Sequence, residues 1–232
     1  MSSMLGTDTS ELARIRLLHI LSPALPTGAY SYSQGIETAV ELGWIAGVED
    51  FSQWITEQIQ GSLHYQELPL IIRLYEAASR GDEKGFDEWS HIALAWRDTS
   101  ESRDEEQFRG VAFLRILESL PDPVFQDLPV ASLRRSALAG IAWAGAKLEI
   151  ALNELLLAYA HTWLETTITS GVKLIPLGQS QGQSLQYSLT PLCVDAVQGA
   201  LMVGEDDIGY ANPAISIASC RHETQYTRIY RS

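Results

Sequence analysis

Apolar residues recur at every third or fourth position along most of the chain, which is the spacing of one face of an α-helix. The spacing is clearest in five stretches, at residues 12–21, 51–59, 68–78, 149–171 and 185–202. No stretch shows the sustained strict alternation of a half-buried strand or an Asn-Gly hairpin signal. The pattern predicts an all-α fold with no significant sheet. We expect a single-domain helical bundle of about eight to ten helices over residues 1–232.

Three of the predicted helices have features of their own. The first follows a frayed N-terminus at residues 1–7 and carries one apolar stripe, formed by Leu12, Ile15, Leu18 and Leu21. The segment 149–171 is apolar nearly all round, which places it at the centre of the bundle. Charge dominates residues 99–109, and an apolar spacing resumes after them. We interpret that region as one long helix whose first half is solvated.

The stretch between the first two helices, Ser22–Glu37, concentrates conformationally special residues. Pro23 and Pro26 stiffen it, and Gly28 permits a sharp turn. Ser31 and Ser33 can each cap the helix that follows. The pattern predicts a rigid elbow with Tyr30 and Tyr32 on its outer bend. The two rings either close the core over a tight turn or form a contact surface.

Charge and composition exclude several classes of partner. The 232 residues carry a formal net charge of −13, which disfavours nucleic acid and anionic membrane as partners. No secretory signal or membrane span is apparent, and the isolated Cys193 and Cys220 suit a reducing compartment. We expect a cytoplasmic protein.

The sequence lacks the usual signatures of catalysis and of metal binding. Its five histidines are scattered, without a His-Glu-x-x-His or Cys-x-x-Cys spacing. It has no phosphate-binding Gly-x-x-x-x-Gly-Lys loop and no Gly-x-Ser-x-Gly elbow. We therefore predict no catalytic residues, no metal site and no cofactor.

Two polar features remain that a packed core would not require. Lys173 stands near the end of the apolar helix, where it either complements the helix dipole or binds a partner. Residues 218–232 form a basic, aromatic arm on an acidic body. A disordered tail would leave Tyr226, Ile229 and Tyr230 in water, whereas tyrosine with arginine is typical of interface anchors. We therefore favour an arm that docks on a partner.

Three motifs of this chain resemble those of the UreF family of urease accessory proteins. They are the elbow Ser22–Glu37, the turn Lys173–Gln179 followed by Gly182 and Gln183, and the closing run Arg221–Ser232. Their order and spacing match the family over essentially the whole chain. The resemblance implies an all-α homodimer without catalysis of its own, which acts in nickel insertion into urease.

The resemblance also implies partners and site residues. Family members bind the accessory protein UreD, called UreH in some organisms, and that pair recruits the GTPase UreG and docks on urease apoprotein. Lys173, together with Gln179, lies at a position that the family associates with control of the GTPase. The arm is implied to become ordered on UreD, through Arg221, His222, Glu223, Gln225, Tyr226 and Arg228.

A rigid, tyrosine-bearing corner on a protein without catalytic chemistry is best used as a contact surface. We therefore expect a second copy of the chain or UreG to meet the elbow at Tyr30, Ser31, Tyr32 and Glu37.

Three functional hypotheses follow from these observations. The first is a non-enzymatic scaffold for nickel insertion. The second is a GTPase-activating regulator of UreG acting through Lys173, although a lone lysine is weaker in that role than an arginine fork. The third is a nickel carrier, which rests on the pathway and on His222 near Cys220.

Overall fold

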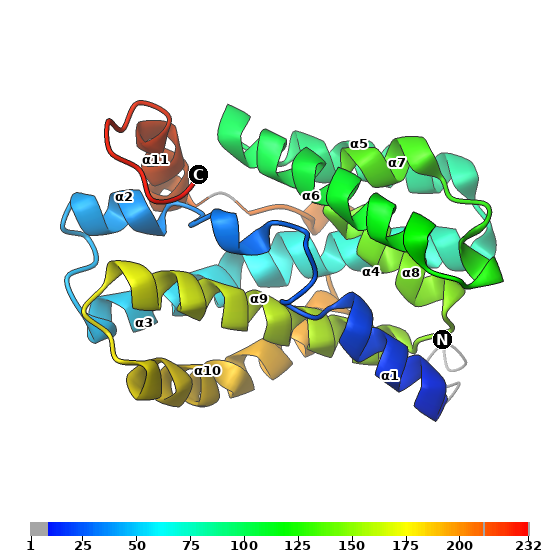
Figure 1. Ribbon diagram of the computed structural model, residues 1–232, viewed down its shortest axis with the longest axis horizontal. Helices are drawn as coiled ribbons and strands as arrows, with labels where there is room; N and C mark the ends of the chain where they lie inside the picture. The colour runs from blue at the N-terminus through cyan, green and yellow to red at the C-terminus, as the bar shows by residue number, and fades with distance from the viewer. Residues whose placement is uncertain (1–8, 211, 232) are drawn as a thin grey trace.

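The computed structural model describes residues 9–210 and 212–231, and these contain helices and no strand (Figure 1). The predicted all-α class is confirmed, while the predicted frayed terminus at residues 1–7 lies outside the described residues. The α-helices are α1 Glu11–Ile20, α2 Ile36–Glu41, α3 Val48–Gln58, α4 Leu68–Arg80, α5 Glu83–Ala95, α6 Ser100–Ser119, α7 Val130–Arg135, α8 Ala137–Lys147, α9 Leu152–Leu174, α10 Gln179–Ala200 and α11 Pro213–His222. Three 3-10 turns, η1 Ala29–Ser31, η3 Pro123–Phe125 and η4 Glu205–Asp207, and the π-helix η2 Ile59–Glu67 complete the described elements.

The core forms where α4 packs against α8 and α9 packs against α10 (Figure 1). α8 contributes small side chains, and Ala139, Ala142 and Ala144 are completely buried. Small residues let neighbouring helices approach closely, as the composition of this segment suggests. Gly140 shows how tight the packing is, because a Cβ atom there would lie 2.6 Å from Cδ1 of Phe113.

The predicted central helix is α9. Its residues Leu155, Leu156 and Leu164 are at most 1% exposed, as expected for a helix between other helices. It ends at Leu174, and Gly178 then serves as N-cap of α10. α9 therefore carries Lys173 in its last turn, at the left-hand end of the bundle in Figure 1, where α2 and α11 also lie.

The helices α3 and α4 are joined by the π-helix η2 without an intervening loop. Pro69 lies in the first turn of α4 and has no amide hydrogen to donate to the preceding turn, which favours a change of hydrogen-bond register. The wider turns of η2 bury Gln66 and Glu67 in the interior. π-Helical segments are frequent at functional sites, and η2 borders one of the two cavities described below.

The predicted long helix over the charged run is α6, but its first half is only partly solvated. Arg103 and Asp104 are exposed as expected. Glu105 and Glu106 are buried, at 6% and 2% exposure, so the prediction of a solvated first half is wrong for these two residues. The cause is the set of arginine and hydroxyl partners described in the next section.

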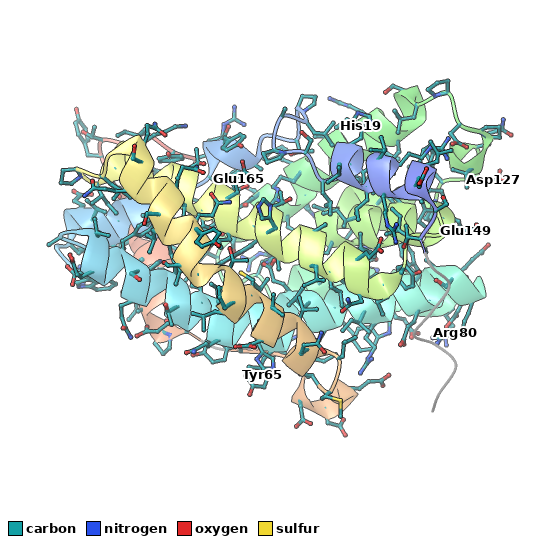
Figure 2. The ribbon with its side chains drawn as sticks, turned by 90° about the horizontal axis from the view of Figure 1, so that it is seen from below. His19, Tyr65, Arg80, Asp127, Glu149 and Glu165 are labelled. Atoms are coloured by element: carbon teal, nitrogen blue, oxygen red, sulfur yellow. The ribbon has the colours of Figure 1, made fainter. Side chains whose placement is uncertain are left out.

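The apolar stripe predicted for the first helix does not face the core. α1 buries Ala13, Leu17 and Ile20, with Leu21 just beyond its end. Leu12, Ile15 and Leu18 are instead 59%, 65% and 66% exposed. In the view of Figure 2, α1 with the labelled His19 lies at the outside of the bundle. The chain thus presents an exposed apolar stripe on α1, defined by Leu12, Ile15 and Leu18.

Candidate partner-binding site

The elbow has the sharp geometry that its sequence predicts. Gly28 adopts φ +76° at the start of η1, and Gly35 adopts φ +84° as the N-cap of α2. Gly35, and not Ser31 or Ser33, is the N-cap of α2, so the helix begins later than predicted. The Ser33 hydroxyl accepts the amide hydrogen of Glu37 at 3.3 Å. Tyr30 is half-buried, but Tyr32 is only 6% exposed, so the expectation of two outward rings is wrong for Tyr32. Burial raises the pKa of the Tyr32 phenol.

The Glu37 carboxylate anchors the C-terminal arm to the elbow. Its two oxygens accept the backbone N–H groups of Ile229 at 2.6 Å and of Tyr230 at 2.9 Å. Glu37 is itself only 6% exposed, so these charge-assisted bonds form away from solvent. Beside them, the Arg231 amide donates to the Ser31 carbonyl oxygen at 2.8 Å. The elbow is therefore in contact with the chain's own arm.

His222 lies completely buried between two carboxylates, at the end of α11. Its Nδ1 is 2.7 Å from Glu101 Oε2, and its Nε2 is 3.4 Å from Glu37 Oε2. The second oxygen of Glu101 accepts from Arg228 Nη1 at 2.6 Å. One ring thus joins α2, α6 and the arm. Cys220, two residues earlier, is exposed, whereas both ring nitrogens of His222 face carboxylates.

The arm is fixed at two further points. The Glu223 carboxylate accepts the amide hydrogen of Ser100 at 3.0 Å and its hydroxyl hydrogen at 2.6 Å, at the first residue of α6. The positive end of the helix favours an anion there, and the hydrogen bond from Ser100 is the largest cause that lowers the pKa of Glu223. Gln225 accepts from the Thr38 hydroxyl of α2 at 2.9 Å.

Lys173 lies close to both the elbow and the arm. Its ammonium nitrogen lies 5.9 Å from the ring centroid of Tyr30 and 5.8 Å from that of Tyr230, within the range of cation–π attraction. Tyr230 is 5% exposed, and its hydroxyl donates to the Ser170 carbonyl oxygen at 3.3 Å. The structure therefore brings the elbow, Lys173 and the arm into one cluster. Gln179 is exposed at the start of α10, and no hydrogen bond among the described residues joins it to this cluster.

The outer side of the arm is free of such contacts. Tyr226 is fully exposed and Ile229 is 70% exposed, and Arg221 is exposed as well. The arm thus buries one tyrosine in its own chain and presents another outward. An exposed segment that carries a tyrosine, an isoleucine and an arginine has the composition of an interface anchor.

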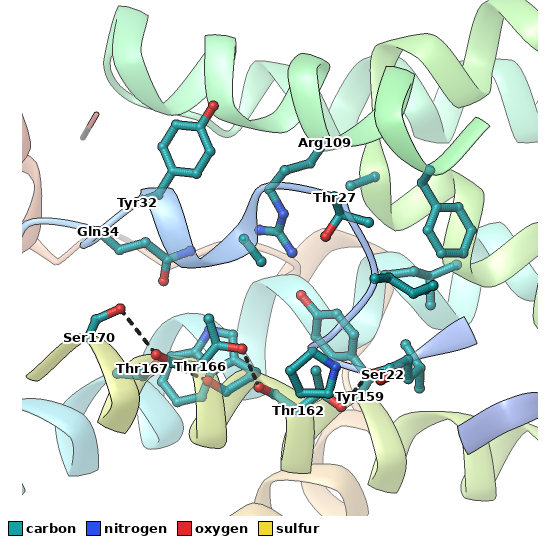
Figure 3. Close-up of a pocket in the computed structure, with 18 of the residues that line it drawn as sticks. Ser22, Thr27, Tyr32, Gln34, Arg109, Tyr159, Thr162, Thr166, Thr167 and Ser170 are labelled. Carbon is teal, nitrogen blue, oxygen red and sulfur yellow. Dashed lines mark hydrogen bonds between the residues drawn. The ribbon is translucent and has the colours of Figure 1, made fainter. Parts of the chain in front are cut away.

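A cavity of about 70 Å³ lies beneath the elbow, against α8 and α9 (Figure 3). Figure 3 shows Arg109 and Gln34 between the elbow and the hydroxyl side chains of α9. Thr166 and Ser170 donate their hydroxyl hydrogens to backbone carbonyl oxygens four residues earlier, so these hydrogens are already engaged. Gln34 holds φ +52° and donates to Glu105 at 3.2 Å, which fixes the elbow to α6.

The sequence analysis missed the buried ionic cluster behind this cavity. Arg97 bridges Glu67 and Glu106 at 2.8 Å each, and the Tyr159 hydroxyl donates to the second oxygen of Glu67. Burial alone would raise the pKa of Glu106, but the charge of Arg97 and the hydrogen bond from Ser136 together lower it. Burial raises the pKa of Tyr159 well above its ordinary value.

Over residues 9–210 and 212–231, no three His, Cys, Asp or Glu side chains are grouped so that they could hold a metal ion. In the same part of the chain, none of the helices combines the length and the apolar character needed to cross a bilayer.

Comparison with known proteins relates this chain to one family. The family model described as UreF matches residues 45–190. Urease accessory protein UreF of Alcanivorax borkumensis is 44% identical over 229 residues, covering 95% of this chain and 98% of the relative. The proteins of the same name from Pseudomonas putida and Citrobacter koseri are 42% and 40% identical, covering 96% and 97% of this chain and 99% and 100% of their own length.

The chain belongs to the UreF family. The resemblance of the three motifs to this family is thereby confirmed. The family model includes Lys173 and Gln179, whereas the elbow and the arm lie outside residues 45–190. The structure connects these three parts of the UreF chain, which are distant in sequence, through Glu37, Lys173 and Tyr230.

Proposed function

We propose that this UreF-family chain is a non-enzymatic scaffold for insertion of nickel into urease. In this role it binds UreD or UreH through the C-terminal arm and recruits the GTPase UreG to urease apoprotein. The observation that carries the proposal is the arm itself, which is held on Glu37 while it presents Tyr226, Ile229 and Arg221 outward. The relatives' name, urease accessory protein, supports a role beside urease rather than as urease.

Removal of the outward tyrosine tests the arm. We expect Tyr226→Ala to fold normally, because the side chain is fully exposed, and to lose at least tenfold in affinity for UreD. Tyr187→Ala on α10 is the matched control, since that tyrosine is 85% exposed and lies outside the arm. Affinity for purified UreD is measured by calorimetry. Unchanged affinity in the arm variant would remove the arm from the interface.

The alternative function, a GTPase-activating regulator of UreG, rests on Lys173. Its ammonium group is exposed but lies beside the rings of Tyr30 and Tyr230. If Lys173 supplies positive charge to the transferring phosphoryl group, Lys173→Ala slows GTP hydrolysis in the assembled complex by 10-fold or more. We expect the scaffold result instead, which is a hydrolysis rate within twofold of wild type. Single-turnover GTP hydrolysis by UreG, measured with the wild-type chain, with Lys173→Ala and without the chain, distinguishes the activator from the scaffold.

The same proposal includes a homodimer, and the exposed stripe on α1 supports it. Leu12, Ile15 and Leu18 are each more than half exposed, and such contiguous apolar surface commonly marks a protein interface. We expect Ile15→Asp to convert a dimer into a monomer in size-exclusion chromatography with light scattering. Ile217→Asp, a second exposed isoleucine on α11, serves as the control. A dimer that persists in the α1 variant would place the interface elsewhere.

A further inference from the structure

A second cavity, of about 120 Å³, lies on the other side of Gln34 and Arg109. It is bordered by the π-helix η2, the α5–α6 junction, α6 and the segment that leads into α11. In the same measure one water molecule needs only about 10–15 Å³, so the cavity can admit a group of several heavy atoms. The lining includes two partly exposed rings, Trp96 at 37% and Tyr210 at 38%.

Two glycines, which have no side chain, make room for these two rings. Gly209 adopts φ +131°, and a Cβ atom there would lie 2.2 Å from Cη2 of Trp96. A Cβ atom at Gly61 would lie 2.3 Å from Cε1 of Tyr210. Tyr210 also stacks on Tyr65 at 6.4 Å between ring centroids, and Figure 2 shows Tyr65 at the outer edge of the molecule. The aromatic rim is therefore held in place before any ligand arrives.

The charges that line this cavity are unbalanced. Four carboxylates, Glu67, Asp98, Glu105 and Glu106, face two guanidinium groups, Arg97 and Arg109. Both guanidinium groups are already engaged, Arg97 with Glu67 and Glu106, and Arg109 with Glu105 at 3.1 Å. These pairs leave the carboxylate of Asp98 without a countercharge.

Asp98 is exposed and lines the same cavity as Trp96. One of its oxygens accepts from the Ser216 hydroxyl at 2.5 Å, and within the described part of the chain it forms no ion pair. The nearby Arg103 directs its guanidinium to the backbone carbonyl oxygens of Arg97 and Asp98 instead. The lining of the cavity therefore includes both an exposed carboxylate and an indole ring.

We propose that this cavity binds an arginine side chain of a partner protein. A guanidinium group is planar, stacks on aromatic faces and forms paired hydrogen bonds with a carboxylate, which matches Trp96, Tyr210 and Asp98. The surplus of carboxylates opposes an anionic ligand. A net charge of −13 on the whole chain favours the approach of a basic partner segment.

The experiment titrates the full chain with N-acetyl-arginine methylamide and follows the indole and backbone signals by NMR. We expect saturable shifts centred on Trp96, Asp98 and Tyr210, and binding at least tenfold weaker in Asp98→Asn. Asp104→Asn, which changes an exposed carboxylate in α6 that does not line the cavity, is the matched control and is expected to bind as wild type. N-acetyl-lysine methylamide is expected to bind more weakly, and acetate to cause no shifts at the cavity.

Several results would overturn the proposal. They are equal binding by Asp98→Asn, shifts confined to another surface, or a preference for acetate. Trp96→Leu gives a second test, because loss of the indole ring should weaken binding of the arginine compound while its ionic contact with Asp98 remains. If the tryptophan variant fails to fold, Asp98→Asn decides the question alone. We expect this variant to fold, because Asp98 is exposed and the side-chain carbonyl oxygen of asparagine can still accept from the Ser216 hydroxyl.

Discussion

Replacement of Arg97 by alanine is expected to destabilise the chain by about 3–5 kcal/mol at pH 7, the range seen when one partner of a buried ion pair is removed. Arg97 is the countercharge for two carboxylates, Glu67 and Glu106, which are 7% and 2% exposed. Without it, both would remain buried with one fewer cation beside them. Because domains have only about 5–15 kcal/mol of stability, the loss is a large fraction of the total. Urea unfolding followed by circular dichroism measures it.

The pH dependence gives a second test of the same cluster. The pKa of Glu106 is lowered in the folded chain, so its ionisation stabilises the fold above the unfolded value near 4.5 and ceases to do so as the pH falls through the folded value. In Arg97→Ala we expect the pKa of Glu106 in the folded chain to be raised instead, because a buried carboxylate without its arginine favours the protonated form. The difference between the two proteins should therefore shrink on acidification from pH 7 to about pH 4.5.

Suitable controls separate this effect from a general cost of losing an arginine. Arg115→Ala, on the exposed side of the same helix α6, should change stability by less than about 0.5 kcal/mol. Arg97→Met combined with Glu106→Leu should recover part of the loss, because the pair is then replaced by apolar groups. A loss below about 1 kcal/mol in Arg97→Ala would contradict a central role for this cluster.

The helices were predictable because each carries a periodic apolar face. The same periodicity contained a signal for the ionic cluster that was not used. Gly110, Phe113 and Leu117 form the buried side of α6, and continuing their spacing toward the N-terminus reaches Glu106. A charged residue on the buried side of a helix needs a partner, but Arg97 lies on a different segment. Its identity depends on tertiary structure that one sequence does not reveal.

The position of α1 shows a second limit. Ala13, Leu17 and Ile20 face the core, while Leu12 and Ile15, which are as large as Leu17 and Ile20, face outward. Periodicity identifies that helix, but both of its faces carry large apolar residues. From the sequence alone, an apolar face that binds another protein looks the same as a core face. The sequence named the residues of the candidate site as a prediction, but it gave no geometry for them. Nothing in the spacing of Glu37, Lys173 and Tyr230 indicates that they meet.

Removal of the Glu37 carboxylate is expected to detach the arm without unfolding the bundle. Glu37 accepts two backbone N–H groups of the arm and lies against His222, so Glu37→Ala removes the contacts that seat residues 229 and 230. Hydrogen bonds to a charged group contribute about 1.5–3 kcal/mol each. Loss of about 3 kcal/mol of local stability corresponds to amide exchange faster by roughly 10²-fold.

Hydrogen exchange resolved by NMR measures this effect at the amides of Ile229 and Tyr230. Glu41→Ala, an exposed glutamate on the same helix α2, is the matched control and should leave both amides protected. Amides of α4 should keep wild-type protection in both variants, because that helix belongs to the core. The Lys173 side chain should become more mobile, since release of Tyr230 removes one of its two rings. Unchanged exchange at Ile229 and Tyr230 in Glu37→Ala would show that other contacts, such as Arg228 with Glu101, suffice to hold the arm.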